Sequence, residues 1–468
     1  MPCRQTNMRP LEILIPAFLS IYLLWAHPRP QFVRSLPAMS LLLTLLHFAV
    51  EGYRWQMAPI YIITAMLGLT ALARLQSPAD WTPLASHLVF ILLAVSTAVP
   101  ILLPVPSIPT PGGPYPVGTR LYELTDPSRP EIYSGRDEAR RFMIQVWYPA
   151  EPSPSDPRAP WMANAEVFAP AIASYINLPP FFLDHLALVN VPAYSDAAVA
   201  QPETSFPIIL FSHGWNGFNA QNTGQALELA SHGYLVVGVQ HTYGAVVTVF
   251  PDGTVAPNNP NALPPDSTPT DEYEIAAQKL VDQWAGDLGF TLDFLKVQND
   301  DGASPYFGKL DLSRVGVYGH STGGGAAVEF CGRDSRCSAV LGQDPFMRPV
   351  SYQVLDQGVN QPAFFLFSQR WRDDADSRNN ELFDRFYPHV PRTFGAVYVE
   401  GTAHYDFSDL PLLSPLAPQL GLKGPINGQR VTAINKDYLV GFFDAALKNG
   451  PKTLFENPSP HPEVKPRK

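Results

Sequence analysis

Four long apolar stretches dominate the first hundred residues of the chain. They cover residues 11–26, 36–50, 57–75 and 84–105, with short polar or proline-containing segments between them. A helix needs about 20 apolar residues to cross a bilayer. The third and fourth stretches reach that length, and the first two reach it with their flanking residues. The pattern therefore predicts an all-α transmembrane region of about four helices over residues 1–105, with the interfacial aromatics Trp25, Tyr53 and Trp55 at segment ends.

The pattern changes after this region. Residues 106–118 are rich in proline and glycine, which predicts an extended linker. Short apolar runs and helical periodicities then alternate from residue 119 to residue 450. The runs that predict strands are 141–148, 206–211, 234–240, 315–319, 340–342, 363–367 and 396–399, and helices are predicted at 221–232, 271–297, 322–330 and 438–447. This alternation predicts an α/β domain with a mostly parallel sheet flanked by helices. The proline-rich, charged residues 451–468 predict a disordered tail.

A Gly-x-Ser-x-Gly motif lies between a predicted strand and a predicted helix, at Gly319, Ser321 and Gly323. Such a strand–turn–helix elbow is typical of the nucleophilic serine in hydrolases of this architecture. The turn presents the hydroxyl at a helix N-terminus, where backbone N–H groups can stabilise a developing oxyanion. Side chains larger than glycine at positions 319 and 323 would clash with neighbouring elements. We therefore predict Ser321 as the nucleophile; the alternative is a glycine-rich turn without chemistry.

A serine nucleophile needs a general base, usually a histidine that a carboxylate orients. In this architecture the base follows the nucleophile along the chain, which leaves His389, His404 and His461. His461 belongs to the predicted disordered tail, and His389 lies in a proline-flanked loop. His404 directly follows the predicted strand 396–399, at the carboxyl edge where sites of such sheets lie. We predict His404 as the base.

Three aspartates are candidates for the orienting acid: Asp344, Asp373 and Asp374. Asp344 follows a predicted strand in the apolar segment VLGQDPF, where a carboxylate without a partner would be costly. His404 would supply that partner. Asp373 and Asp374 also follow a strand, but the arginines around them favour a solvated, charge-compensated loop. Asp406 fits a loop or capping role. The sequence favours Asp344 as the acid and leaves Asp373 and Asp374 as alternatives.

The segment FSHGW, residues 211–215, follows another apolar strand earlier in the domain. In this architecture one oxyanion N–H comes from the residue after the nucleophile and another from such a loop. We therefore predict the backbone amides of Thr322 and Trp215 as the oxyanion hole. His213 precedes the nucleophile, so we predict that it bonds the loop backbone and is not the base.

Composition and charge narrow the function further. The net charge of -10 argues against a nucleic-acid partner. Charged residues make up 16% of the chain, below the usual value of about 25%, and the deficit lies in the first hundred residues. The three cysteines form no Cys-x-x-Cys pair that would indicate zinc or redox chemistry. Cys331 and Cys337 either form a disulfide in an oxidising compartment or are two buried thiols.

The motifs FSHGWNGFNAQNT, VYGHSTGGGAAVEF, LGQDPFMRP and EGTAHYDFSD together resemble the platelet-activating-factor acetylhydrolases of the plasma and intracellular type-II class and their bacterial relatives. The resemblance covers roughly residues 118–447. It implies an α/β-hydrolase fold, a triad of Ser321, Asp344 and His404, and no metal or cofactor. It also implies hydrolysis of short or oxidised acyl chains on phospholipids. Bacterial relatives include broad carboxylesterases and polyester hydrolases, which are the alternative activity.

These features together predict a serine carboxylic-ester hydrolase at a membrane. A membrane region beside an esterase favours a lipid ester, because such a substrate shares the bilayer. The apolar segment 178–194 is either a cap or patch against lipid or a helix packed on the sheet. Arginines are balanced on the two sides of the apolar stretches, so the positive-inside rule does not orient them.

The apolar stretches predict a multi-pass membrane protein, and the possible bridge between Cys331 and Cys337 favours an extracytoplasmic catalytic domain. A peptidase or thioesterase is a competing activity. A non-catalytic binding protein with this fold is a further alternative, and it would be expected to have a broken triad.

Overall fold

The computed structural model describes residues 8–73, 82–201, 204–374, 377–419, 421–456 and 459–467. The chain divides into two compact units. The first, the helical unit, comprises Met1–Ser107 together with Phe182–Val189 and Leu413–Leu416. The second, the sheet unit, comprises Ile108–Phe181, Asn190–Leu412 and Ala417–Lys468. The division after Ser107 falls inside the segment that the sequence predicts as a linker.

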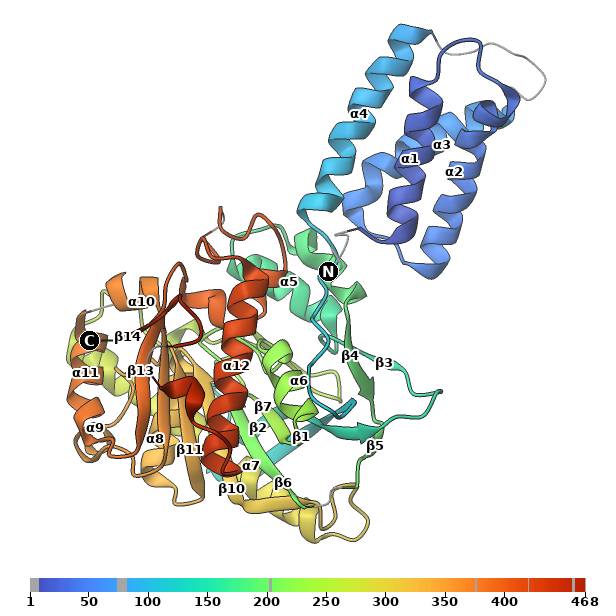
Figure 1. Ribbon diagram of the computed structural model, residues 1–468. Helices are drawn as coiled ribbons and strands as arrows, with labels where there is room; N and C mark the ends of the chain where they lie inside the picture. The colour runs from blue at the N-terminus through green and yellow to red at the C-terminus, as the bar shows by residue number, and fades with distance from the viewer. Residues whose placement is uncertain are drawn as a thin grey trace. The chain divides into compact units, whose positions relative to one another are not determined.

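The helical unit forms from the predicted apolar stretches (Figure 1). Its helices are α1 (Pro10–Leu24), α2 (Gln31–Val50), the short 3-10 helix η1 (Trp55–Met57), α3 (Ala58–Ala73) and α4 (Pro83–Leu102). Residues 74–75 of the third stretch lie outside the described residues. Among the described residues, three segments are long and apolar enough to cross a membrane: Gln31–Val50, Trp55–Ala73 and Pro83–Leu102. The first stretch gives the shorter apolar helix α1, which runs from Pro10 to Leu24 and has 15 residues.

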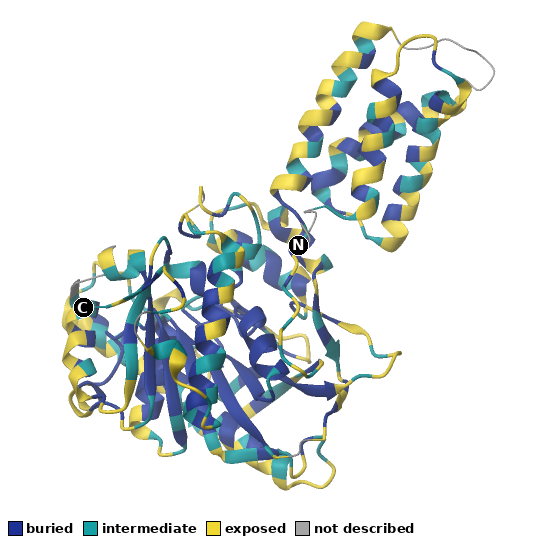
Figure 2. Cartoon of the chain, viewed as in Figure 1, coloured by how far each residue is buried: buried dark blue, intermediate teal, exposed yellow. Residues whose placement is uncertain are grey.

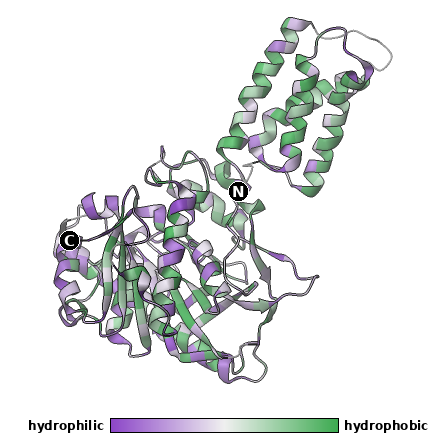
Figure 3. Ribbon diagram, viewed as in Figure 1, coloured by the Kyte–Doolittle hydropathy of each residue, from purple (hydrophilic) through white to green (hydrophobic). Residues whose placement is uncertain are grey.

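The helical unit is apolar on its outside as well as in its core. Figure 3 shows hydrophobic residues around its helices, and Figure 2 shows that many of them are exposed. A helix that is hydrophobic all round is typical of a buried or membrane environment. The exposed side chains include Leu42, Leu45, Ile62, Leu69, Leu84, Leu88, Ile91, Leu92 and Val95.

A buried ionic cluster ties the helices together. Glu12 is completely buried, and it accepts hydrogen bonds from Arg54 Nη2 at 2.8 Å and from Arg9 Nη2 at 2.8 Å. Arg54 Nη1 also donates to the carbonyl of Leu103 at 3.0 Å, at the end of α4. Buried charges require such partners. The cluster therefore joins the starts of α1 and α3 to the end of α4.

Two later segments of the chain, Phe182–Val189 and Leu413–Leu416, also belong to the helical unit. The first contains most of the 3-10 helix η2 (Pro180–Leu188). Within the unit, Trp55 Nε1 donates to the carbonyl of Phe182 at 3.2 Å, and the Gln56 amide lies 2.7 Å from His185 Nδ1. The apolar segment 178–194 is therefore not a helix packed on the sheet, because residues 182–189 belong to the helical unit.

Within the described residues, the sheet unit is built on a 12-stranded sheet with the order β14-β13-β12-β11-β10-β6-β7-β2-β1-β4-β3, and β5 pairs with β2. The strands are β1 (Val117–Pro130), β2 (Ala139–Glu151), β3 (Arg158–Pro160), β4 (Asn190–Ser195), β5 (Ala198–Val199), β6 (Phe206–Ser212), β7 (Leu235–Gln240), β10 (Leu310–His320), β11 (Cys337–Gln343), β12 (Ala363–Ser368), β13 (Thr393–Val399) and β14 (Val464–Pro466). A separate hairpin pairs β8 (Val247–Val249) with β9 (Val255–Pro257).

Helices cover both faces of this sheet (Figure 1). The α-helices are α5 (Ala165–Tyr175), α6 (Thr223–Ser231), α7 (Thr270–Asp300), α8 (Thr322–Arg333), α9 (Tyr352–Gln357), α10 (Gln369–Asp374), α11 (Ser377–Phe386) and α12 (Gly428–Leu447). The short 3-10 helices are η3 (Pro260–Ala262), η4 (Tyr387–His389), η5 (His404–Phe407), η6 (Leu410–Leu412) and η7 (Thr453–Phe455). Helices α6 and α12 pack together on one face, and α7 and α8 pack together on the other.

The mostly parallel sheet with helices on both faces confirms the predicted fold class. Strands β7, β6, β10, β11, β12 and β13 run parallel, so their carboxyl ends share one edge. The long strand β1, which pairs antiparallel with β2, was not predicted because its polar residues and prolines hide the apolar alternation. The prediction of a disordered tail is wrong for Val464–Pro466, which pairs antiparallel with β13 and so satisfies an exposed sheet edge.

A disulfide joins Cys331, at the end of α8, to Cys337, at the start of β11, with the two Cα atoms 5.2 Å apart. This distance lies within the usual range for a bridge. The structure therefore favours the disulfide over the two buried thiols.

We expect the denatured, unreduced protein to carry one reactive thiol, Cys3, and three after reduction, because the bridge removes two. Maleimide labelling followed by intact mass spectrometry measures this number. A count of three thiols in protein isolated without reductant, with alkylation during lysis, would contradict the bridge.

Candidate active site

Ser321 occupies a strained turn between β10 and α8. Its backbone angles are φ 58° and ψ -124°, in a region that residues with side chains rarely adopt. A Cβ on Gly319 would lie 2.1 Å from the carbonyl oxygen of Gly323, and a Cβ on Gly323 would lie 2.1 Å from that of Ser212. Only glycine fits at both positions. The side chain of Ser321 makes no capping hydrogen bond to α8, so the hydroxyl is not engaged by the helix that follows it.

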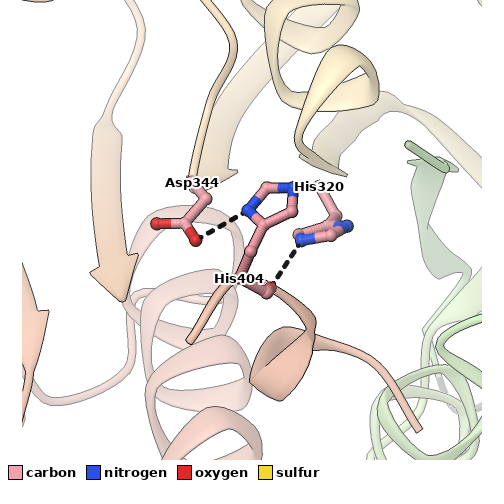
Figure 4. Close-up of side chains that lie close together, drawn as sticks. All are labelled: His320, Asp344 and His404. Carbon is pink, nitrogen blue, oxygen red and sulfur yellow. Dashed lines mark hydrogen bonds and ion pairs between the residues drawn. The ribbon is translucent and has the colours of Figure 1, made fainter. Parts of the chain in front are cut away.

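Asp344 and His404 lie side by side although they are 60 residues apart in the chain. Asp344 follows β11 and His404 opens η5 after β13, so the parallel sheet brings both to its carboxyl edge. The Nδ1–H of His404 donates to Asp344 Oδ2 at 2.9 Å (Figure 4). Asp344 is completely buried, whereas 23% of the His404 side chain is exposed. Because this bond uses Nδ1, Nε2 of His404 is the ring nitrogen that does not bond Asp344.

The other candidate acids and bases lie elsewhere. Asp373 is exposed and pairs with Arg372, and the side chain of Asp374 lies outside the described residues. His389 is exposed at the end of η4, and His461 pairs with Asp437 at 3.1 Å. Asp406 is buried and accepts hydrogen bonds from the backbone amides of Ala403 and Gly424, which fits the predicted loop role.

Ser368, at the end of β12, holds the carboxylate of Asp344. Its backbone N–H donates to Oδ1 at 2.6 Å, and its hydroxyl donates to Oδ2 at 2.7 Å. Burial raises the pKa of Asp344, and the two hydrogen bonds from Ser368 oppose that rise. Sequence reasoning missed Ser368, although its place at the end of the strand beside β11 was a usable signal.

Two aromatic rings enclose His404. The Trp371 ring stacks on the imidazole, with centroids 4.3 Å apart and an interplanar angle of 15°, and the His320 ring lies 4.4 Å away. His320 Nε2–H donates to the backbone carbonyl of His404 at 2.9 Å (Figure 4). The side chain of Gln221 donates to His320 Nδ1 at 3.1 Å. Burial lowers the pKa of His404, which keeps the imidazole neutral and able to accept a proton.

Buried amides fix the loop that carries His404. The Asn222 side chain donates to the carbonyl of Phe407 at 2.7 Å, and the Gln225 side chain donates to the same carbonyl at 2.8 Å. Asp409 accepts the backbone N–H of Gly224 at 3.0 Å, in the first turn of α6. The position of His404 therefore depends on α6 as well as on its own strand, which periodicity alone did not reveal.

The predicted oxyanion loop lies against Ser321. A Cβ on Gly214 would lie 3.1 Å from Cβ of Ser321. Thr322 is the first residue of α8, and the first N–H groups of a helix have no partner within it. His213 is completely buried and lies 2.7 Å from the Gly214 carbonyl through Nδ1, so it bonds the loop backbone as the sequence suggested.

The architecture and the serine elbow define the chain as an α/β-hydrolase. The family model for platelet-activating factor acetylhydrolase, isoform II, matches residues 104–452. The chain belongs to this family, which confirms the resemblance seen in its motifs.

Named relatives agree with this assignment. Platelet-activating factor acetylhydrolase of Cavia porcellus is 27% identical over an alignment of 349 positions, and the match covers 70% of this chain and 76% of the relative. The probable 1-alkyl-2-acetylglycerophosphocholine esterase of Arthroderma benhamiae is 24% identical, over 76% of this chain and 92% of the relative. A solved structure, the ferulic acid esterase from Streptomyces cinnamoneus, is 27% identical with a TM-score of 0.64, and the match covers 78% of this chain and 100% of that one. The chain is a carboxylic ester hydrolase.

Substituting Ser368 by alanine is expected to move the acid limb of the kcat/KM profile to higher pH by about 1 unit. Without the hydroxyl donor the pKa of Asp344 rises further, so its carboxylate, and with it the activity, is lost at a higher pH. Profiles from pH 5 to pH 9 on a soluble ester measure the shift.

Ser368→Thr is the matched control because it keeps the hydroxyl. The charged and titratable groups that face Asp344 are His404, His320 and Asp406, and they are unchanged in both variants. A uniform fall in rate at every pH would show that Ser368 acts only on stability.

Proposed function

We propose that the protein hydrolyses lipid esters with short acyl chains, with Ser321 as nucleophile, His404 as general base and Asp344 as the acid that orients it. The single observation that carries this proposal is the hydrogen bond between His404 and buried Asp344 at the carboxyl edge of the sheet, the edge at which Ser321 follows β10 on a strained turn. Neutral His404 accepts the proton of Ser321 through Nε2, while Nδ1–H stays on the carboxylate. The serine oxygen attacks the ester carbonyl carbon.

The oxyanion of the tetrahedral intermediate is held by the amides of Trp215 and Thr322. Collapse of the intermediate expels the alcohol, which takes the proton from His404 and leaves an acyl-enzyme. Water then attacks the acyl carbon as His404 removes its proton. Release of the carboxylic acid returns Ser321 and neutral His404.

The substrate class that we propose is a phospholipid with a short acyl chain. The relatives named as acetylhydrolase and as 1-alkyl-2-acetylglycerophosphocholine esterase support this choice. The likeness to a ferulic acid esterase favours a broad carboxylesterase as the second candidate. The two differ in whether a lipid aggregate improves the rate.

We also propose that the helical unit is a multi-pass membrane anchor. Its three long apolar helices and the exposed Leu and Ile side chains support this, because such a surface in water would be unfavourable. A disulfide persists in oxidising compartments, so the Cys331–Cys337 bridge supports a catalytic unit outside the cytoplasm.

The decisive activity test compares the detergent-solubilised full chain with its Ser321→Ala variant on p-nitrophenyl esters from acetate to palmitate. We expect activity to peak at the shortest chains and to fall about 10³-fold or more in the variant. Short-chain phospholipid in micelles and methyl ferulate extend the series. Preference for the micellar lipid supports the acetylhydrolase-like activity, and preference for methyl ferulate supports the broad esterase.

A Ser321→Ala variant that keeps the wild-type rate would remove Ser321 from the chemistry. A folded wild type without activity on any of these esters would favour the non-catalytic binding protein. Thermal unfolding of both proteins is the control for folding.

Membranes from cells that express the full chain are expected to retain the protein after an alkaline carbonate wash, since spanning helices are not extracted by high pH. Immunoblots of pellet and supernatant measure this, with a peripheral protein as control. Recovery in the supernatant would contradict the anchor.

A further inference from the structure

A second set of serine, histidine and aspartate lies behind the oxyanion loop. The hydroxyl of Ser212 donates to His241 Nε2 at 2.9 Å, and His241 Nδ1–H donates to Asp287 Oδ2 at 3.0 Å. These residues come from the end of β6, the residue after β7 and the middle of α7. The bonding pattern is that of a catalytic relay.

This relay is sealed from substrate. Ser212, His241 and Asp287 each have 0% of their surface exposed. The Trp284 ring stacks on His241, with centroids 4.3 Å apart and an interplanar angle of 5°. A serine in this position cannot meet an ester, so the three residues act on the surrounding structure.

Arginines fix the aspartate end of the relay. Arg140 donates to Asp287 through Nε at 3.0 Å and through Nη2 at 2.7 Å, and Arg129 Nη2 donates at 2.9 Å. Arg140 Nη1 also donates to the carbonyl of Thr242, the residue after His241, at 3.1 Å. These bonds fix Asp287, which holds the His241 side chain. They also fix the carbonyl of Thr242, which follows His241 in the backbone.

His213 connects this braced backbone to the oxyanion loop. The backbone N–H of His241 donates to His213 Nε2 at 3.1 Å. Nε2 is therefore the acceptor and Nδ1 carries the proton, which it donates to the carbonyl of Gly214 at 2.7 Å. The same carbonyl accepts the N–H of Gly217 at 2.8 Å, so its direction is fixed twice.

The carbonyl of Gly214 and the N–H of Trp215 belong to one peptide group. In a trans peptide the two point in opposite directions, so fixing the carbonyl also fixes the N–H. Gly214 lies against Ser321, and across the described ranges the N–H of Trp215 donates to no acceptor. A rotation of this peptide would replace the donor by a carbonyl oxygen.

We propose that His213, held by the buried Ser212–His241–Asp287 relay, is a positioning residue that locks the Gly214–Trp215 peptide with its N–H toward the oxyanion. The proposal rests on the function proposed above. It predicts that the two ring nitrogens of His213 contribute differently to catalysis. Nδ1 sets the direction of the peptide, whereas Nε2 only anchors the ring.

Asparagine and glutamine separate the two nitrogens. In His213→Asn the amide nitrogen of the new side chain reaches the place of Nδ1 and keeps a donor for the Gly214 carbonyl. In His213→Gln the amide oxygen reaches the place of Nε2 and keeps an acceptor for the His241 N–H. Each variant loses one buried hydrogen bond, so the two form a matched pair for stability.

The experiment measures kcat, KM and the melting temperature of the full chain in detergent with p-nitrophenyl acetate, with Ser321→Ala as reference. We expect kcat to fall about 10²-fold in His213→Gln and less than about 10-fold in His213→Asn, with KM unchanged and similar melting temperatures. The affinity for a trifluoromethyl ketone, which forms an oxyanion when Ser321 adds to its carbonyl, should fall with kcat.

Equal losses of kcat in the two variants, or losses that follow the melting temperature, would overturn the lock. If Ser321→Ala is inactive, equal losses in the two His213 variants overturn the lock but leave the proposed function intact. If Ser321→Ala keeps the wild-type rate, the proposed function and the lock are both wrong.

Ser212→Ala tests the relay should His213→Gln fail to fold. It removes the donor to His241 Nε2 and leaves His213, Gly214 and Trp215 unchanged, and we expect a smaller fall in kcat, within about 10-fold, at unchanged KM. Wild-type kcat in Ser212→Ala would show that the relay does not support His213.

Discussion

The hydrogen bond between His404 and Asp344 is the interaction on which the rest of the candidate site depends. A completely buried carboxylate is unfavourable without partners, and Asp344 finds three donors, two from Ser368 and one from His404. Burial of His404 itself lowers the pKa of its imidazole and keeps it neutral. Because both residues sit at the carboxyl edge of parallel strands, the sheet brings them together, and the contacts of the His404 loop with α6 complete its position.

Buried polar groups fix the loops on both sides of Ser321. On the side of His404, the side chains of Asn222 and Gln225 hold the carbonyl of Phe407. On the other side, His213 holds the carbonyl of Gly214. Apolar packing has no direction, whereas hydrogen bonds do, so these contacts are suited to orienting single peptide groups.

The helical unit has an apolar surface and a polar cluster in its interior, where Glu12 bonds Arg9 and Arg54. The attraction between buried charges offsets the cost of removing them from water only where the geometry is good and every charge has a partner. The unit also includes Phe182–Val189 and Leu413–Leu416, so the chain passes between the two units more than once.

The sequence by itself determined the class of the fold and the main chemistry. Apolar runs set the strands of the parallel core, because a strand buried on both faces must be apolar throughout. Glycine at 319 and 323 marked the elbow, since no larger side chain fits there. Chain order selected His404, and the apolar segment around Asp344 selected that aspartate. The structure brings these two residues into contact.

The tertiary structure decided what depends on pairings between distant segments. Ser368 and Trp371 lie in no motif, and the motif around Ser321 does not predict the contact of its His320 with His404. These contacts with Asp344 or His404 arise only when neighbouring strands align. The same holds for the relay from Ser212 to Asp287 and for β14, whose three residues form a strand only because β13 offers an unpaired edge. Periodicity records what one segment buries, whereas a hydrogen bond between two segments exists only after both have been placed.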